Sequence, residues 1–276
     1  RNPGLALPLI ALQYHEVRLD FDLAGDLETY LDKTVFKVWA NYIYLDTEER
    51  RRFAQKGHEY LIEQVQHTGS DSVTSGSTKQ VRLSYNHPVK ELVWCFNSGS
   101  AAGPKLWNFT SNAGATDVVI DLDPAANAAN EGAVPIDSLG TPLFQTKTGG
   151  SGSVFGEDAS GSGDTAVGPL KSLKLVLNGQ DRFKEQSGKY FNQVQPYQHH
   201  SGSPMPGIYS YSFALKPEEH QPTGTCNFSR IDNAQVAVEL KALTGSTLAT
   251  PSLDMFAVNY NVLRVQSGMG GLAFSN

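Results

Sequence analysis

Alternation of apolar and polar residues limits the fold of this chain more than any other feature of its sequence. In residues 15–23, HEVRLDFDL, valine, leucine and phenylalanine alternate with charged residues. A period of two sends successive side chains to opposite faces of a strand, so the pattern is typical of a strand with one buried and one solvated face. Aromatic and β-branched runs at residues 36–45 and 59–66 predict two further strands.

Turn residues separate more strand-like runs along the chain, at residues 80–85, 90–96, 172–183, 207–215, 233–240 and 253–265. The pair Asn178-Gly179 is a hairpin signal, and a turn at residues 86–88 separates two runs because Pro88 cannot donate to a ladder. Roughly eight or nine strands with almost no helix fit a sandwich of two sheets. We therefore predict an all-β fold, an eight-stranded jelly-roll sandwich.

Residues 46–57, DTEERRRFAQKG, predict the one short helix of the chain. Asp46 suits the N-cap, acidic residues occupy the first turn, and Gly57 ends the helix. Helical spacing brings the two acids of EERRR (48–52) onto its arginines. This predicts a solvated or interface ion-pair cluster and not a groove for a polyanion.

Residues 98–168 interrupt the strand pattern. They hold twelve of the 26 glycines, and their two lysines and eight acidic residues give a charge of −6, equal to that of the whole chain. A segment of this length inside a compact domain is typically functional or mobile, and its acidity argues against nucleic-acid binding on that face. We predict one jelly-roll domain over residues 1–276, with residues 1–13 as a linker leading into it and residues 98–168 as an acidic Gly/Ala/Ser-rich surface loop.

Cys95 and Cys226 are too few for a secreted disulfide framework. We expect two reduced, packed thiols, with one long-range disulfide as the alternative. The apolar run at residues 5–12 is short and broken by Pro8, so it predicts neither a signal peptide nor a membrane span. The chain begins at Arg1 and not at methionine, which favours a piece of a longer polypeptide.

No residue pattern predicts a catalytic, metal or cofactor site. His199-His200 and His220 could supply metal ligands, but adjacent histidines on a strand point to opposite faces, which favours a loop or surface pair. Cys95 lies in LVWCF, where a small buried hydrophobe is favoured over a nucleophile. We therefore expect neither an enzyme nor a bound cofactor.

Two pairs of aspartates also favour structural roles. Asp20 and Asp22 share one strand face, where contact with solvent or cross-strand cations is favoured over the carboxylate pair of a glycosidase. Asp121 and Asp123, in DLDP, could give oxygens to a calcium ion, but a turn is favoured.

The last residues, VQSGMGGLAFSN (265–276), show the spacing of a dinucleotide-binding fingerprint at Gly268, Gly270 and Ala273. That fingerprint needs a helix after the glycine turn to hold a pyrophosphate. Only FSN follows the alanine, which is too short for a helix. The spacing is therefore fortuitous.

Two N-glycosylation sequons occur, at Asn108 and Asn227. Both asparagines are candidate glycosylation sites. The predicted loop favours a glycan at Asn108, whereas the strand residues beside Asn227 favour a structural role.

Several long strings closely resemble one protein family: PGLALPLIALQYHEVRLDFDL (3–23), YIYLDTEERRRFAQKGHEYLIEQVQ (42–66), YNHPVKELVW (85–94), LNGQDRF (177–183), YFNQVQPYQ (190–198), GTCNFSRIDN (224–233) and NYNVLRVQSGMGGLAFSN (259–276). The family is the major capsid proteins of nucleocytoplasmic large DNA viruses, especially the algal-virus branch, and the strings resemble its C-terminal half. They run along nearly the whole chain except residues 98–168.

The resemblance implies a double jelly-roll protein, three copies of which form a pseudo-hexagonal capsomer of an icosahedral shell. This chain would supply the second jelly roll, with residues 1–4 at the junction between the halves and residues 98–168 on the outer face. Residues 267–276 would be a terminal arm after the last strand, anchored by Phe274.

The implied function is that of a structural virion protein without a cofactor. Its partners would be itself as a homotrimer, neighbouring capsomers and minor capsid proteins, with no direct nucleic-acid contact and no membrane insertion. It would assemble in the host-cell cytoplasm and reside in the virion capsid. The alternative is a stand-alone carbohydrate-binding jelly-roll module that uses Trp107 and Phe109 as a stacking platform.

Overall fold

The computed structural model describes residues 2–21, 37–74, 76–97, 109, 115–119, 145–148, 168–202, 204, 207–241 and 251–275. Contacts divide the chain into two compact units, one of residues 63–260 and one of residues 1–62 together with 261–276. The predicted single domain over residues 1–276, with a linker over residues 1–13, stays a prediction.

Six strands form the first sheet, in the order β1-β12-β3-β10, with β13 pairing β12 and β9 pairing β3. Their bounds are β1 (His58–Ser72), β3 (Pro88–Asn97), β9 (Ile208–Ser212), β10 (Cys226–Asn227), β12 (Ser252–Gln266) and β13 (Met269–Leu272). Strand β3 is central, because β9, β10 and β12 all run antiparallel to it.

Five strands form the second sheet, in the order β2-β11-β6-β7, with β8 also pairing β6. They are β2 (Thr78–Leu83), β6 (Leu170–Leu177), β7 (Gln180–Asp181), β8 (Gln186–Ser187) and β11 (Ala234–Leu240), all in antiparallel pairs. The two described pieces of the predicted loop, β4 (Ala115–Val119) and β5 (Gln145–Thr148), pair with each other.

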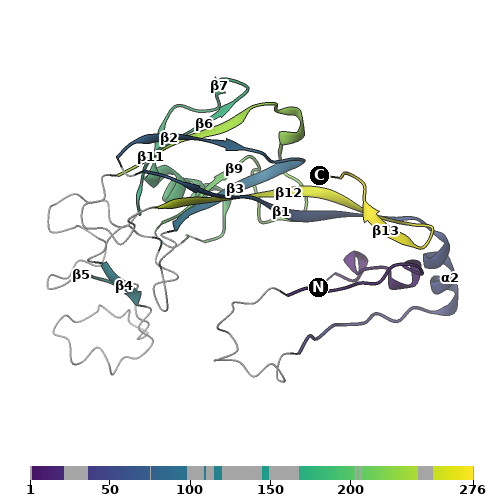
Figure 1. Ribbon diagram of the computed structural model, residues 1–276. Coiled ribbons are helices and arrows are strands. Elements are labelled where there is room, and N and C mark those ends of the chain that lie inside the picture. Colours follow the sequence, from purple (N-terminus) through teal and green to yellow (C-terminus); the bar gives the residue numbers. More distant parts are fainter. Residues whose placement is uncertain are drawn as a thin grey trace, which may run out of the picture. The chain divides into compact units, whose positions relative to one another are not determined.

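The hydrophobic core of residues 63–260 is built from both sheets, which Figure 1 shows as two layers. Every second residue of β11 is buried, as expected of a strand with one face in a core. Trp94 of β3 is 1% exposed, and its ring centroid lies 5.2 Å from that of Phe191 and 5.9 Å from that of Tyr209. Large aromatic rings dominate the energetics of such cores. The predicted alternation therefore describes the strands of this sandwich correctly.

The predicted helix forms as α2 (Thr47–Gln55). The backbone N–H of Asp46, the N-cap, donates to a Glu49 carboxylate oxygen at 3.2 Å, as in a capping box. Arg51 pairs with Glu48 one turn earlier at 2.9 Å. The helix, its N-cap and an ion pair within EERRR are thus confirmed.

Two predicted turns are also present. Asn178 (φ 51°) and Gly179 (φ 79°) both have positive φ and connect β6 to β7, as a two-residue hairpin turn requires. His87 (φ 67°) lies in the turn before β3, and its carbonyl accepts a hydrogen bond from the Phe228 N–H at 3.0 Å.

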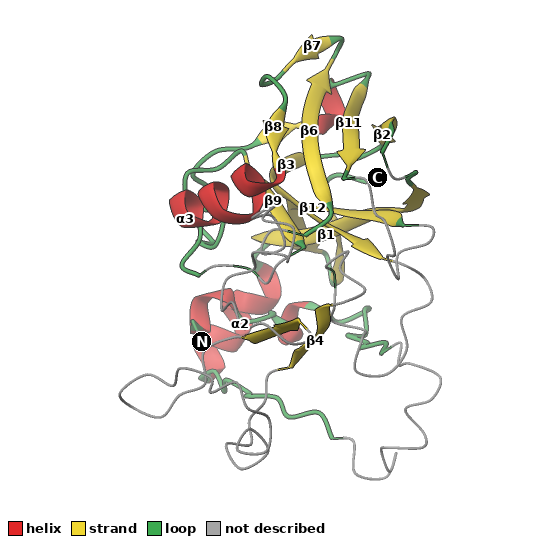
Figure 2. Cartoon of the chain, turned by 90° about the vertical axis from the view of Figure 1, so that its left-hand side faces the viewer, coloured by secondary structure: helices red, strands yellow, loops and turns green. Residues whose placement is uncertain are grey.

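The structure adds a helical segment that the sequence analysis did not predict. A π-helix, η7 (Tyr190–Val194), continues into α3 (Gln195–His199), and Figure 2 shows α3 beside the sheets. The Asn192 side chain donates to the Ile208 carbonyl at 2.8 Å, and the Gln195 side chain accepts from the Ser212 N–H at 3.1 Å. These side-chain bonds to β9 and the buried Phe191 ring hold the segment in place.

Two predicted strands, at residues 15–23 and 36–45, do not form in the parts of these runs that the structure describes, so the predictions are wrong there. Residues 15–21 and 37–45 belong to no helix or strand, and Figure 1 draws them without strand arrows. A strand needs a neighbour that accepts and donates its backbone hydrogen bonds. The alternation predicts the two faces of a strand, but it cannot supply that neighbour.

The prediction of a terminal arm over residues 267–276 is also wrong, because the chain turns back as a β-hairpin. Ser267 (φ 54°) and Gly268 (φ 82°) form the turn between β12 and β13. Phe274 is mostly exposed, which does not fit the predicted anchor, and its carbonyl accepts a hydrogen bond from the Asn261 side chain at 2.9 Å.

Candidate functional site

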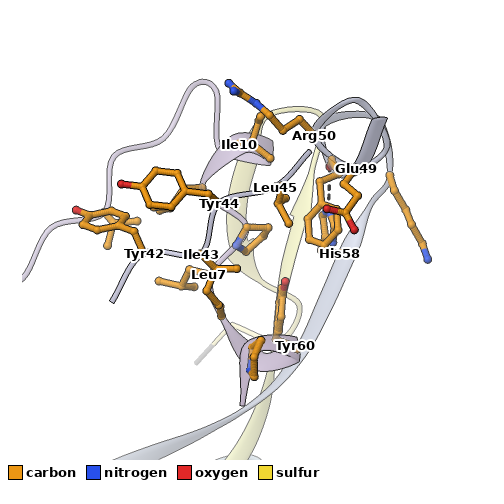
Figure 3. A pocket seen from close by; sticks show the side chains of 18 of the residues that line it. Leu7, Ile10, Tyr42, Ile43, Tyr44, Leu45, Glu49, Arg50, His58 and Tyr60 are labelled. Carbon is orange, nitrogen blue, oxygen red and sulfur yellow. Dashed lines mark hydrogen bonds between the residues drawn. The ribbon is translucent and has the colours of Figure 1, made fainter. Parts of the chain in front are cut away.

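An open groove with a volume of about 1690 Å³ lies within the unit of residues 1–62 and 261–276. We call it the apolar groove; its main apolar side chains are Leu7, Ile10, Val17, Leu19, Tyr42 and Ile43. They come from the N-terminal stretch, which holds the 3-10 helices η1 (Pro3–Leu5) and η2 (Leu9–Ala11), and from the residues before α2. Figure 3 shows Leu7, Ile10 and Ile43 among the lining side chains.

Short polar contacts hold the walls of the groove. A His58 ring nitrogen lies 2.8 Å from the Phe53 carbonyl, the contact drawn as a dashed line in Figure 3, and it joins α2 to β1. Arg264 of β12 pairs with Glu59 of β1 at 2.8 Å. These contacts fix α2, β1 and β12 on one side of the groove.

The hairpin turn between β12 and β13 supports the N-terminal stretch. The Tyr14 N–H donates to the Gly268 carbonyl at 2.9 Å, and the Gly270 N–H bonds to a His15 ring nitrogen at 3.0 Å. A Cβ at Gly268 would come within 2.5 Å of the Tyr14 ring, and its φ of +82° also favours glycine. The glycines of the false dinucleotide fingerprint therefore serve a turn and a close approach.

Exposed charged side chains also line the groove: Glu49, Arg50, Lys56, Glu59 and Arg264. Burial raises the pKa of Tyr60. No group of three or more His, Cys, Asp or Glu side chains within the described residues could hold a metal ion. Its volume exceeds the roughly 300–1,000 Å³ of ordinary small-molecule pockets.

A second polar feature, a cluster around Lys90 of β3, is structural. The buried Lys90 ammonium lies 2.8 Å from a Glu63 carboxylate oxygen and 5.4 Å from the centre of the Tyr260 ring. The register of β3 with β12 shifts at this point, which places Lys90 in a β-bulge. The ion pair and the ring stabilise the buried charge and join β3 to β1.

The histidines considered as metal ligands contact other groups. His199 bonds to the Leu215 carbonyl at 3.0 Å, and His200 lies 2.8 Å from a Glu91 carboxylate oxygen. His220 is 3.9 Å from a Glu63 carboxylate oxygen. The adjacent pair lies at the end of α3 and not on a strand, and its two rings have different partners.

Both cysteines are free thiols, as predicted. Burial, with a smaller contribution from the Asp254 carboxylate, raises the pKa of Cys95 to about 11, and burial also raises the pKa of Cys226. A raised pKa keeps a thiol protonated and unreactive at neutral pH. This is the opposite of what a nucleophile needs.

The remaining predicted positions fall in two groups. Asp20 is exposed, in agreement with the expected contact with solvent, but its cation is Arg18 of the same segment at 3.0 Å and not a cross-strand residue, because residues 15–21 form no strand. Asn108, Trp107, Asp22, Asp121 and Asp123 lie outside the described residues.

Asn227, the other sequon asparagine, is exposed but takes part in local structure. Its side chain accepts a hydrogen bond from the Ser229 N–H at 3.1 Å and caps the 3-10 helix η8 (Phe228–Arg230). The Ser229 hydroxyl in turn accepts from the His87 N–H at 2.7 Å. The structural role favoured for Asn227 is therefore present, and glycosylation there stays a prediction.

Family models match almost the whole chain. Residues 49–271 match the model of the large eukaryotic DNA virus major capsid protein, and residues 1–46 match the model of the major capsid protein N-terminus. The two matches meet at the start of α2. The junction predicted at residues 1–4 is therefore wrong, because the N-terminal model extends far beyond it.

Individual relatives agree with these matches. The chain is 43% identical over its full length to the major capsid protein of Phaeocystis pouchetii virus and 41% identical to that of Paramecium bursaria Chlorella virus 1. It covers 63% and 64% of these two relatives, so it spans less than two thirds of their length.

Solved structures give the same result. All of the chain superposes on 68% of a chain in the quasi-atomic model of the PBCV-1 virus capsid, with a TM-score of 0.64 and 38% identity. The crystal structure of PBCV-1 VP54, fitted into a reconstruction of the virophage Sputnik, matches with a TM-score of 0.66. The predicted all-β jelly-roll class is thereby confirmed.

Proposed function

Because the chain belongs to the family of large eukaryotic DNA virus major capsid proteins, we propose that it is a structural subunit of a virion capsid. The family is one of capsid proteins and not of enzymes. The carrying observation is the family match over residues 49–271, which includes both sheets of the sandwich. The comparisons give no support to the alternative of a carbohydrate-binding module.

In this proposal the sandwich is the rigid building block of a trimeric, pseudo-hexagonal capsomer. Neighbouring capsomers and minor capsid proteins contact it, and residues 98–168 face outward. Weak contacts suffice for such a shell because each is repeated many times. The proposal includes no direct contact with nucleic acid and no membrane insertion. Among the described residues, no helix is long and apolar enough to span a bilayer.

Assembly in the host-cell cytoplasm and glycosylation at Asn108 or Asn227 belong to the same proposal. An acidic, glycine-rich segment is a suitable place for a glycan at Asn108. At Asn227 a glycan would have to be compatible with the cap on η8 and with the buried Phe228 beside it. Mass spectrometry of glycopeptides from purified virions tests both positions.

The test of the proposed function is the mass of the assembled protein. The chain is co-expressed with the part of the Phaeocystis pouchetii virus relative that lies outside the match, and light scattering measures the mass of the complex at several concentrations. We expect a mass of three copies of each part. A complex that stays a single copy at every concentration would overturn the capsomer proposal.

A further inference from the structure

We propose that His15 is a pH-sensitive latch, which holds the N-terminal stretch on the β12–β13 hairpin at neutral pH and releases it in acid. The latch consists of two hydrogen bonds that successive residues, Tyr14 and His15, make to the hairpin. All of its groups belong to this chain and to one compact unit. The latch therefore adds a response to pH to the proposed capsid function without depending on that function.

The hydrogen bond at His15 has a fixed direction. The Nδ1 atom of the ring lies 3.0 Å from the Gly270 backbone nitrogen, which carries a hydrogen and can only donate. Nδ1 must therefore accept, so the neutral ring carries its proton on Nε2. A protonated ring has an N–H on both nitrogens and would face the Gly270 N–H with a second donor. Protonation thus turns this bond into a repulsive contact.

The hairpin itself leaves the Gly270 N–H free for His15. A two-residue turn is closed by a hydrogen-bonded pair, here Gln266 and Met269, and the type of pair alternates along an antiparallel ladder. Gly270, opposite Val265, is therefore in a non-hydrogen-bonded pair, and its N–H points away from β12. The His15 ring supplies the acceptor that this amide needs.

The N-terminal stretch fits closely against the hairpin on both sides of this bond. A Cβ at Gly270 would lie 3.0 Å from the Leu12 Cδ2 atom. The Tyr14 N–H donates to the Gly268 carbonyl at 2.9 Å. A backbone carbonyl does not titrate in this range, so the bond of Tyr14 is lost only if the stretch itself moves. Tyr14 therefore reports release of the stretch, whereas Gly270 reports loss of a single bond.

Other histidines of the chain make bonds of the opposite direction. A ring nitrogen lies 2.8 Å from a carbonyl oxygen at His58 and 3.0 Å from one at His199. A ring nitrogen must donate to a carbonyl, and a second proton on the other nitrogen leaves that bond in place. At His200 the facing group is a carboxylate oxygen at 2.8 Å, which also accepts. Of these histidines, only His15 has to stay neutral to keep its bond.

Few other ionisable groups of the described residues face the latch. Residues 267–272 of the hairpin carry no titratable side chain. On β12, Arg264 pairs with Glu59 of β1. The neighbours of the latch histidine in sequence are Tyr14 and Glu16. A tyrosine ordinarily stays neutral and a glutamate ordinarily stays ionised between about pH 5.5 and pH 7.5.

The sign of the pH dependence follows from the neutral ring that the latch needs. A histidine ordinarily takes up its second proton between about pH 5 and pH 8. The folded latch excludes that proton, whereas the open stretch accepts it. The latch is therefore closed above this range and opens as the pH falls through it.

The test is residue-resolved hydrogen exchange of the full 276-residue chain at about pH 7.5 and about pH 5.5. Protection factors remove the intrinsic effect of pH on exchange. We expect those of the Gly270 and Tyr14 amides to fall by about threefold to tenfold at the lower pH, the net value of one hydrogen bond. The Asn178 N–H donates to the Asn233 carbonyl at 2.7 Å, so it is a control without a titratable partner and should keep its protection.

Three substitutions separate the latch from a general effect of acid. His15→Asn keeps an acceptor oxygen near the position of Nδ1 that does not titrate, so protection should be the same at both pH values. His15→Phe keeps a ring without an acceptor and should lower protection by about threefold to tenfold already at neutral pH. His199→Asn is the matched control, which should leave the pH response of the unsubstituted chain intact.

Three results would overturn the inference: equal protection at both pH values in the unsubstituted chain, a pH response that survives in His15→Asn, or full protection in His15→Phe at neutral pH. A loss at Gly270 alone, with Tyr14 unchanged, would contradict release of the stretch. The unsubstituted chain and His15→Asn decide the question even if His15→Phe does not fold. None of these measurements involves capsomer mass, so failure of the latch and failure of the proposed function are distinguishable.

Discussion

Residues 15–21 and strand β11 carry the same alternation of apolar and polar residues, yet they have opposite surroundings. In β11, Val236 and Val238 are buried, and the strand lies between β2 and β6. In residues 15–21, Val17 and Leu19 are more than half exposed, and no strand of the described residues pairs with them. The two sequence patterns are the same, so the difference in burial comes from the neighbouring strands.

The comparison separates two conditions for a strand. Alternation decides which side chains share a face, whereas a ladder partner satisfies the backbone and an opposing layer buries the apolar face. Residues 63–260 meet both conditions within the chain. Residues 15–21 and 37–45 meet the first condition and, among the described residues, not the second.

The largest expected effect contrasts two tryptophans. Trp94 in the sandwich is 1% exposed and Trp39 in the N-terminal unit is 89% exposed. Trp94→Ala should lower the free energy of unfolding by about 3–5 kcal/mol, because it removes a large buried ring and leaves a cavity. Trp39→Ala should change it by less than about 0.5 kcal/mol. Urea unfolding of both variants measures the difference, and similar losses would show that the N-terminal unit is already packed.

The same contrast explains what the sequence could predict. The predictions of β3, β6, β11 and β12 from alternation hold because the strands that pair with them lie in this chain. Helix α2 was predictable from its N-cap and its first-turn acids. The segment of η7 and α3 was not, since side-chain bonds to β9 fix it. No sequence motif predicts the apolar groove. It is visible only once three-dimensional structure shows which apolar residues stay exposed.

Thiol labelling gives the next contrast. The background variant is Cys226→Ser, in which Cys95 is the one native thiol that remains. Burial raises the pKa of Cys95 to about 11, so little thiolate exists at pH 8. Tyr44 of the groove is 92% exposed. The thiol that Tyr44→Cys introduces there should react more than about 100-fold faster than Cys95. Stopped-flow labelling with a disulfide reagent measures both rates. Comparable rates would mean that the sandwich opens easily.

The pH dependence of Cys95 has a defined sign. Its labelling rate should rise about tenfold per pH unit until the pH approaches the raised pKa. Because folding disfavours the thiolate, Cys95 should also make the protein less stable as the pH rises from about 9 towards 11.

The smallest expected effect contrasts two ion pairs. Lys90 is buried and pairs with the partly exposed Glu63, whereas Arg51 and Glu48 are both exposed on α2. Glu63→Gln should cost about 2 kcal/mol of unfolding free energy, less than a fully buried pair would, because Glu63 keeps some contact with water. Glu48→Gln should cost less than about 0.5 kcal/mol.

Lys90→Met distinguishes attraction within the pair from the penalty of an isolated charge. If the loss in Glu63→Gln comes from leaving a buried ammonium uncompensated, then Lys90→Met should be less destabilising than Glu63→Gln, since it removes that charge and keeps the apolar stem. Adding about 1 M salt should reduce the small effect at Glu48 and change the effect at Glu63 little, because exposed pairs are screened and buried pairs are not. A greater loss in Lys90→Met would instead assign the stability to the ion pair and to the contact of Lys90 with the Tyr260 ring.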